Sequence, residues 1–284
     1  MDPGRKRRAG RVSKEKKTES RPEDRKEGVG DGRLQKIVTN FYSPPENVQY
    51  GVVKIEGEEA RHISKVLRQK VGDTLAVVDG CGVRYRVVLE QIKRDYVLGR
   101  VVNQVRKENE AVVSLTLACG ISTGSKMDLV IEKCTELGVR KFVPVMTQQG
   151  AVELDEPAKI KKKLSRWNKV ALAAMKQSLR CFLPKIEEPV SLTNLALKTV
   201  DYDLSLIASL EPEAKSLKES LQSEEPFKDI LLLVGPEAGF SEEELELCRA
   251  RGFVAVRLGP RRLRTETACV LFCGLVLGYL GELE

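Results

Sequence analysis

Two loops near the C-terminal end of the sequence carry the residues best suited to chemistry. The first loop, residues 235–240 (GPEAGF), follows the apolar run 230–234 and leads into Ser241 and three glutamates. The second loop, residues 258–264 (LGPRRLR), follows another apolar run and leads into the apolar segment 268–280. In α/β proteins, ligands bind at loops that follow the carboxyl ends of parallel strands. The pair of loops therefore predicts a ligand site.

The charge of the first loop limits what it can bind. Ser241 and Glu244 have the spacing of a capping box, which predicts a helix start. Acidic residues at that start repel anions, so a cationic or zwitterionic ligand fits better than a phosphate. The sequence contains neither a P-loop nor a GxGxxG fingerprint. On this loop alone, a glycine-rich turn before a capped helix stays open as the alternative.

The second loop carries a group of arginines before a buried helix. Arg261, Arg262 and Arg264 can bind RNA phosphate or pair with nearby glutamates. Thr265 or Thr267 can cap the helix that follows.

The elements that position these loops divide the chain into two folded parts. Residues 36–108 contain short β-branched runs separated by turns, including a hairpin signal at 79–82, and predict a small β-barrel. Residues 109–284 alternate apolar strands with helical stretches, which predicts an α/β sheet. Connections in proteins rarely thread through one another, so this pattern alone favours an unknotted, doubly wound sheet.

The net charge of +7 is concentrated near the start of the chain. Residues 1–33 hold 12 of the 48 basic and 7 of the 41 acidic residues, which accounts for +5. Residues 1–35 lack apolar periodicity and predict a disordered basic tail. The remainder is nearly balanced, so an RNA site must be a local patch.

The cysteines and the single histidine argue against a metal site. The seven cysteines form no CxxC pair, and His62 has no histidine partner. We expect reduced, mostly buried thiols in a cytoplasmic protein. No apolar segment is long enough to span a membrane.

Longer motifs resemble a known family, the bacterial 16S ribosomal RNA uridine N3-methyltransferases of the RsmE family. The motifs that carry the resemblance are 61–68 (RHISKVLR), 71–73 (VGD), 133–139 (KCTELGV), 167–180, 235–244 and 258–268. The resemblance covers about residues 38–281. Two positions depart from the commonest pattern, namely Ala238, where glycine is usual, and Arg262, where an aliphatic residue is usual.

The resemblance implies a SPOUT α/β trefoil-knot domain preceded by a small PUA-like β-barrel domain, acting as a homodimer without a metal. It implies S-adenosyl-L-methionine as cofactor and 16S rRNA in the small ribosomal subunit as substrate. By position, it assigns the cofactor to Leu210, Gly235, Pro236, Glu237, Gly239, Phe240, Leu258, Gly259, Leu263, Arg264 and Thr267.

Methyl transfer to N3 of uridine requires an unpaired base, because N3 lies on the Watson–Crick edge. The protein must orient two reactants and stabilise negative charge on the base. We hypothesise that Arg180 or Arg264 supplies the cation, and that Gln177 and Ser178 form hydrogen bonds with the base edge.

The segment from Arg61 to Arg68 is the candidate RNA contact of the barrel. Arg61, Lys65 and Arg68 can share one helical face and contact phosphates. His62 either joins them or satisfies backbone groups. The alternatives are another SPOUT enzyme, acting on a ribose 2′-hydroxyl or on tRNA, and a non-catalytic RNA-binding protein.

Overall fold

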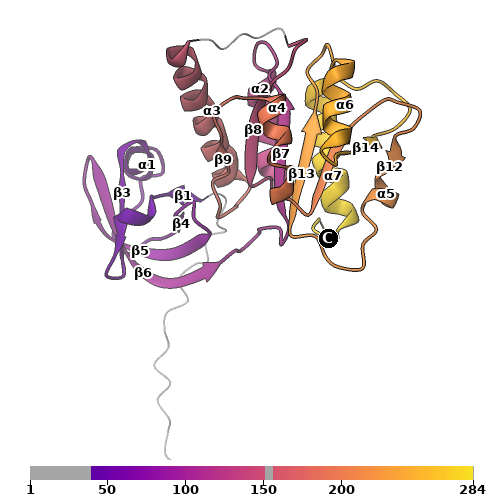
Figure 1. The fold of residues 1–284 in the computed structure, drawn as a ribbon. Helices are drawn as coiled ribbons and strands as arrows, with labels where there is room; N and C mark the ends of the chain where they lie inside the picture. Colours follow the sequence, from indigo (N-terminus) through magenta and orange to yellow (C-terminus); the bar gives the residue numbers. More distant parts are fainter. Residues whose placement is uncertain (1–39, 151–155, 284) are drawn as a thin grey trace, which may run out of the picture. The chain divides into compact units, whose positions relative to one another are not determined.

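The computed structural model describes residues 40–150 and 156–283, which belong to one compact unit (Figure 1). The predicted tail, residues 1–35, lies outside the described residues. The unit contains two sheets, each with its own apolar core.

The first sheet is the barrel predicted from the β-branched runs. Its six strands have the order β1-β4-β5-β6-β3-β2. The long strand β5 buries alternate residues and the hairpin from β4 to β5 is antiparallel, as the turn at residues 79–82 predicts. The elements are β1 Phe41–Tyr42, a short helix Pro45–Asn47, β2 Val48–Gln49, β3 Val52–Glu56, α1 Gly57–Arg61, a π-helical turn His62–Val66, β4 Thr74–Val78, β5 Val83–Ile92 and β6 Tyr96–Arg106.

The second sheet is parallel and has the order β10-β8-β7-β13-β11-β14-β12, with β9 also paired to β8. Its strands are β7 Ser114–Gly120, β8 Lys141–Met146, β9 Lys185–Ile186, β10 Val190–Ser191, β11 Leu204–Ala208, β12 Lys215–Ser216, β13 Asp229–Val234 and β14 Val254–Arg257. Its helices are α2 Lys126–Leu137, α3 Pro157–Gln177, α4 Leu192–Ala196, a short helix Thr199–Asp201, α5 Leu217–Ser220, α6 Glu242–Ala250 and α7 Thr265–Tyr279.

Helices cover both faces of this sheet, which explains why β13 is apolar throughout. Ile230, Leu232 and Val234 pack into the core formed with α2, α3 and α7. Leu231 and Leu233 pack on the opposite face, against α4 and α6 (Figure 1). A parallel strand buried on both faces needs such an uninterrupted apolar run.

The order of the strands differs from a simple progression along the chain. The late strand β13 lies between β7 and β11, so it is inserted into the sheet and not added at its edge. The trefoil knot that the resemblance implies stays a prediction. The predicted division after residue 108 falls between the end of β6 and the start of β7. No helix among the described residues is both long and apolar enough to cross a membrane.

Candidate active site

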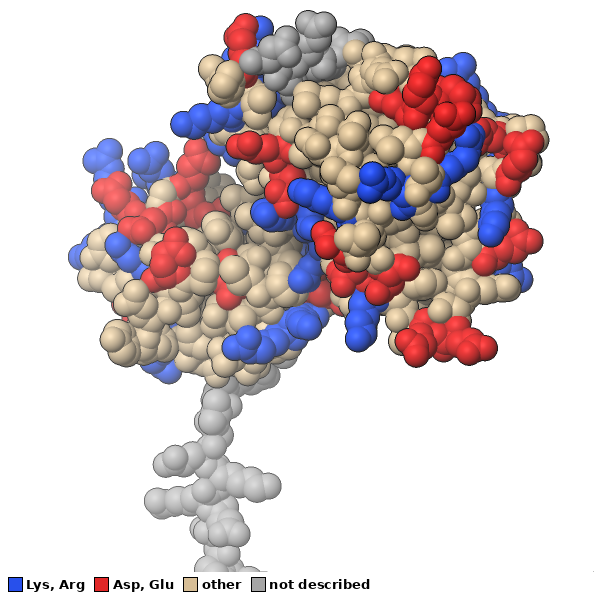
Figure 2. Space-filling view, viewed as in Figure 1, with Lys and Arg blue, Asp and Glu red and all other residues tan. Residues whose placement is uncertain are grey.

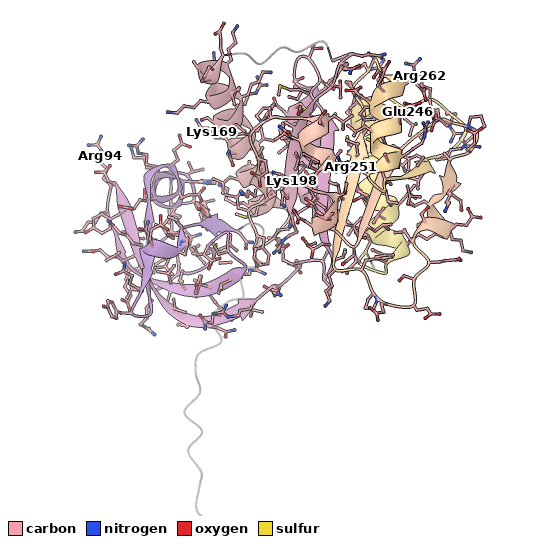
Figure 3. All side chains as sticks on the ribbon, viewed as in Figure 1. Arg94, Lys169, Lys198, Glu246, Arg251 and Arg262 are labelled. Carbon is pink, nitrogen blue, oxygen red and sulfur yellow. The ribbon has the colours of Figure 1, made fainter. Side chains whose placement is uncertain are left out.

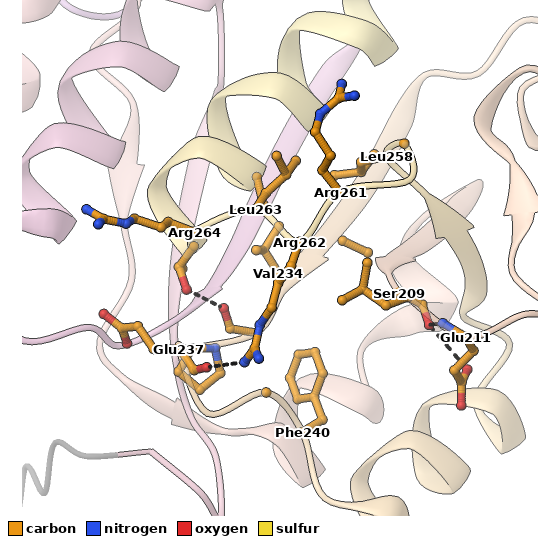
Figure 4. Close-up of a pocket in the computed structure, with 18 of the residues that line it drawn as sticks. Ser209, Glu211, Val234, Glu237, Phe240, Leu258, Arg261, Arg262, Leu263 and Arg264 are labelled. Carbon is orange, nitrogen blue, oxygen red and sulfur yellow. Dashed lines mark hydrogen bonds between the residues drawn. The ribbon is translucent and has the colours of Figure 1, made fainter.

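A cavity of about 710 Å³ opens at the carboxyl ends of β11, β13 and β14 (Figure 4). These three strands are neighbours in the sheet, with β11 in the middle. The loops that follow them therefore meet, although they are far apart in the sequence. Both loops singled out in the sequence contribute to the cavity.

Ten of the eleven residues assigned to the cofactor by resemblance line this one cavity. They are Leu210, Gly235, Pro236, Glu237, Gly239, Phe240, Leu258, Gly259, Leu263 and Arg264. The eleventh, Thr267, is exposed and does not line it. Thr265 and Ala268 do, because residues three apart share a face of α7.

The loop after β13 has a defined backbone. Gly239 is left-handed, with φ of +81°, and its N–H donates to the carbonyl oxygen of Pro236 at 3.0 Å. The left-handed position is therefore Gly239 and not Ala238. The predicted capping box is present, since Ser241 and Glu244 each accept a hydrogen bond from the other's N–H. The helix start thus fixes one end of the loop.

Two contacts fix the other end of this loop. The Thr265 hydroxyl donates to the carbonyl oxygen of Gly235 at 3.0 Å, which joins the start of α7 to the loop. The backbone of Gly120 also packs closely against the ring of Pro236. A Cβ added at Gly120 would lie only 2.4 Å from that ring, so a larger residue does not fit there. Neither Thr265 nor Thr267 caps α7. The N-cap residue is Arg264, and its side chain forms no capping hydrogen bond.

The carboxylates of the cavity already have partners. Glu237 pairs with Lys126, and the hydrogen bond from Lys126 lowers the pKa of the Glu237 carboxyl group. Glu211 pairs with Arg249. Arg257 donates to the carbonyl oxygens of Glu211 and Pro212, at 3.0 and 2.7 Å, and so holds the loop after β11.

Arg180 does not line the cavity, contrary to a role as the cation beside the base. Its side chain is 2% exposed and forms a salt bridge with Glu110 at 2.7 Å. It also donates to the carbonyl oxygens of Thr135 and Val139, at 2.8 and 2.9 Å. These bonds occupy most of the donors of a guanidinium group, so Arg180 acts here as a structural residue.

Gln177 and Ser178 lie at the C-terminal end of α3 and do not line the cavity either. Gln177 is exposed. The Ser178 hydroxyl donates to the carbonyl oxygen of Ala174 at 2.8 Å, which leaves its oxygen able to accept. Of the four residues assigned to catalysis, Arg264 is the one that reaches the cavity.

The candidate RNA residues are exposed on the barrel. Arg61 ends α1, while His62 and Lys65 belong to the π-helical turn. Arg68 lies beyond the helix with φ of +52°, so the single helical face expected for the three cations does not form. His62 packs edge-on against Phe41. On the face drawn in Figure 2, basic and acidic side chains are interspersed, without a large area of one sign.

The sequence did not identify several residues of the cavity. Ser209 and Glu211 follow β11, which is a strand end like the other two and could have been singled out on that ground. Leu245, on α6, gave no signal beyond a helical apolar position.

Comparison with known proteins agrees with this architecture. Residues 108–277 match the model of an RNA methyltransferase domain, and residues 55–102 match that of an RNA methyltransferase PUA domain. These matches cover both folded parts. The protein is an enzyme of the class of RNA methyltransferases that combine a PUA domain with an α/β domain.

Relatives define the family more narrowly. The chain is 32% identical to Ribosomal RNA small subunit methyltransferase E of Bacillus subtilis, over 81% of this chain and 90% of that protein. It is 30% identical to the protein of that name from Synechocystis, over 79% and 72%. A crystal structure of the Neisseria gonorrhoeae enzyme, bound to S-adenosyl methionine, has a TM-score of 0.75 and 29% identity, over 85% and 97% of the two chains. The chain belongs to the ribosomal RNA small subunit methyltransferase E (RsmE) family.

Proposed function

We propose that this enzyme transfers a methyl group from S-adenosylmethionine to N3 of a uridine in 16S rRNA of the assembled small ribosomal subunit. The observation that carries the proposal is that residues assigned to the cofactor, from three separate loops, line one cavity together. Membership in the RsmE family supports the choice of a ribosomal RNA substrate.

The cavity fits the proposed cofactor in size and chemistry. Small-molecule sites commonly enclose about 300–1,000 Å³, and this cavity lies within that range. Val234, Phe240 and Leu258 offer apolar walls for an adenine ring, and the loop backbones offer polar groups.

The bound cofactor supplies a methyl group on a sulfonium, and the protein has to position the base and stabilise its charge. Arg264 adjoins the cavity as the N-cap residue of α7, so its guanidinium is suited to the negative charge that develops on O2 or O4 of the base. Gln177 and Ser178 do not line the cavity of their own chain, so we assign them to the base edge at the site of a second subunit. The target base has to leave its helix before N3 can react.

Exposed cations on the barrel hold the RNA. Arg61, Lys65 and Arg68 contact phosphates, which orient the RNA without reading its sequence. His62, also exposed, lies among them.

The test is incubation of the enzyme with labelled S-adenosylmethionine and small subunits that lack the modification, followed by nucleoside analysis. With the unmodified enzyme we expect label in 3-methyluridine of 16S rRNA. With the Arg264→Ala variant we expect no label. Label on a ribose 2′-oxygen, or in tRNA offered in parallel, would refute the assignment.

A further inference from the structure

The positive charge around the cavity exceeds what its carboxylates can balance. Glu237 and Glu211 are engaged by Lys126 and Arg249, which lie outside the two loops. Among the described residues, Arg261, Arg262 and Arg264 form no salt bridge. A ligand that fits this cavity should therefore present an anionic group to at least one arginine.

Arg262 has the geometry for that contact. Its side chain extends from the loop after β14 toward the loop after β13, and Nη2 donates to the carbonyl oxygen of Glu237 at 3.4 Å (Figure 4). This bond is long for an N–H···O contact, so it costs little to give up. The neighbouring Arg261 points the opposite way in the same view.

We propose that Arg262 is a cofactor-binding residue that pairs with the α-carboxylate of the methionine part of the ligand. This inference rests on the proposed function, because it takes S-adenosylmethionine as the ligand. The sulfonium and the ammonium group of that molecule are cations, and the carboxylate is its one anion. A guanidinium can bind a carboxylate through two parallel hydrogen bonds, with matching geometry.

The other arginines are less suited to this contact. Arg264 is directed to a different side of the cavity from Arg262 in Figure 4, and the proposed function assigns it to the base. Arg261 points the opposite way in the same view. Of these three arginines, Arg262 is directed at the loop after β13.

The experiment compares two ligands that differ only at the amino-acid end. S-adenosylhomocysteine carries the carboxylate and the ammonium group, whereas 5′-methylthioadenosine has the same adenosyl thioether without either. Calorimetric titration of Arg262→Leu should show an about tenfold higher Kd for S-adenosylhomocysteine, as expected for loss of one charge-assisted contact at a partly exposed site. The Kd for 5′-methylthioadenosine should stay the same. Arg262→Lys keeps the positive charge but loses the planar guanidinium that can form two parallel hydrogen bonds. It should give an intermediate Kd for S-adenosylhomocysteine.

Two variants control for loss of charge. Arg261→Leu removes a charge next to Arg262, on a side chain directed elsewhere. Arg251→Leu removes a positive charge at the C-terminal end of α6, which is the end away from the loop after β13 (Figure 3). Neither variant should change the Kd for S-adenosylhomocysteine relative to the Kd for 5′-methylthioadenosine.

The outcomes separate the inference from the proposed function. An unchanged Kd for S-adenosylhomocysteine in Arg262→Leu, or equal weakening of both ligands, overturns the carboxylate contact. Weaker retention of 16S rRNA with unchanged S-adenosylhomocysteine binding also overturns it and assigns Arg262 to RNA. If the unmodified enzyme binds neither ligand, the proposed function itself fails.

Discussion

Arg180 is buried and forms an ion pair with the Glu110 carboxylate, at 2.7 Å. The sequence placed it beside Gln177 and Ser178, and so suggested a shared role at the base. Its partner Glu110 lies 70 residues earlier and belongs to no motif. The Glu110 carboxylate also accepts the N–H groups of Cys181 and Phe182, at 2.7 and 2.8 Å. Such long-range pairing leaves no local pattern from which it could be predicted.

We predict that Glu110→Leu lowers the free energy of unfolding by about 3–5 kcal/mol, because it leaves a buried arginine without its counter-ion. Both side chains are almost fully buried, at 1% and 2% exposed. Chemical denaturation measures the loss. The double variant Glu110→Leu, Arg180→Met should be more stable than Glu110→Leu alone. A double variant less stable than Glu110→Leu would contradict this account of the pair.

The thiols should differ sharply in reactivity. Cys81 is exposed, while the other six cysteines are buried. Burial raises the pKa of Cys181 to about 11 and that of Cys248 to about 12, so they stay protonated. Because the thiolate is the reactive form, we predict that a thiol reagent at about pH 8 labels Cys81 first in the native enzyme. Burial and Asp79 raise the pKa of Cys81 as well, so its labelling should accelerate as the pH rises.

Mass spectrometry of labelled peptides identifies the reactive residue. Denaturant should expose all seven thiols. Rapid native labelling of a core residue such as Cys269 would show that the packing differs from the structure described.

At the scale of elements, local pattern predicted most of the long strands and helices. The apolar run 230–234 lies within β13, and α6 begins directly after Ser241, as the predicted capping box requires. The two-residue strands β9, β10 and β12 were missed, because two residues show no alternation. The insertion of β13 between β7 and β11 could not be predicted either. Apolar periodicity indicates that a strand is buried, but it does not indicate which strands lie beside it in the sheet.

Two capping boxes within the described part of the chain allow a matched comparison. Ser241 begins α6, where both residues of the box are buried, and Ser216 begins the four-residue helix α5, where its bonds are exposed. We predict that Ser241→Ala lowers the free energy of unfolding by about 1–2 kcal/mol and that Ser216→Ala lowers it by less. The reason is that a buried N–H group that loses its partner cannot form a hydrogen bond with water instead. Chemical denaturation compares the two. Equal losses would show that burial of the box does not matter.

At the scale of the whole molecule, ligand binding should be visible as stability. A ligand that binds the folded state at 100 times its Kd adds about 2.7 kcal/mol. We predict that S-adenosylhomocysteine raises the Tm of the enzyme, and that Gly239→Arg removes the shift by placing a long side chain at the cavity. Thermal denaturation with and without ligand provides the measurement.

Gly252→Arg is the control for backbone strain. Gly252 has φ of +82°, close to that of Gly239, and also has open space at its Cβ, but it lies outside the cavity. Its variant should lower the Tm without abolishing the ligand-induced shift. If both variants lost the shift, strain rather than obstruction of the cavity would be the cause.

The separation of Arg264 from Gln177 and Ser178 bears on the predicted homodimer. Because α3 does not line the cavity of its own chain, we predict that the partner subunit supplies these residues to each site. Mixing Arg264→Ala with Gln177→Ala subunits should then restore activity, since random pairing leaves about one site in four intact. Rate measurements before and after subunit exchange test this. No recovery after confirmed exchange would place each complete site within one chain.

The location of the cavity has a consequence for synthesis. Every loop that lines it comes from the last third of the chain, and its wall is completed by the first residues of α7. The barrel strands end at Arg106 and can emerge from a translating ribosome long before that. A polypeptide interrupted shortly before α7 would therefore keep the part proposed to grip RNA and lack part of the cavity proposed to hold the methyl donor. It would compete for the same RNA without modifying it.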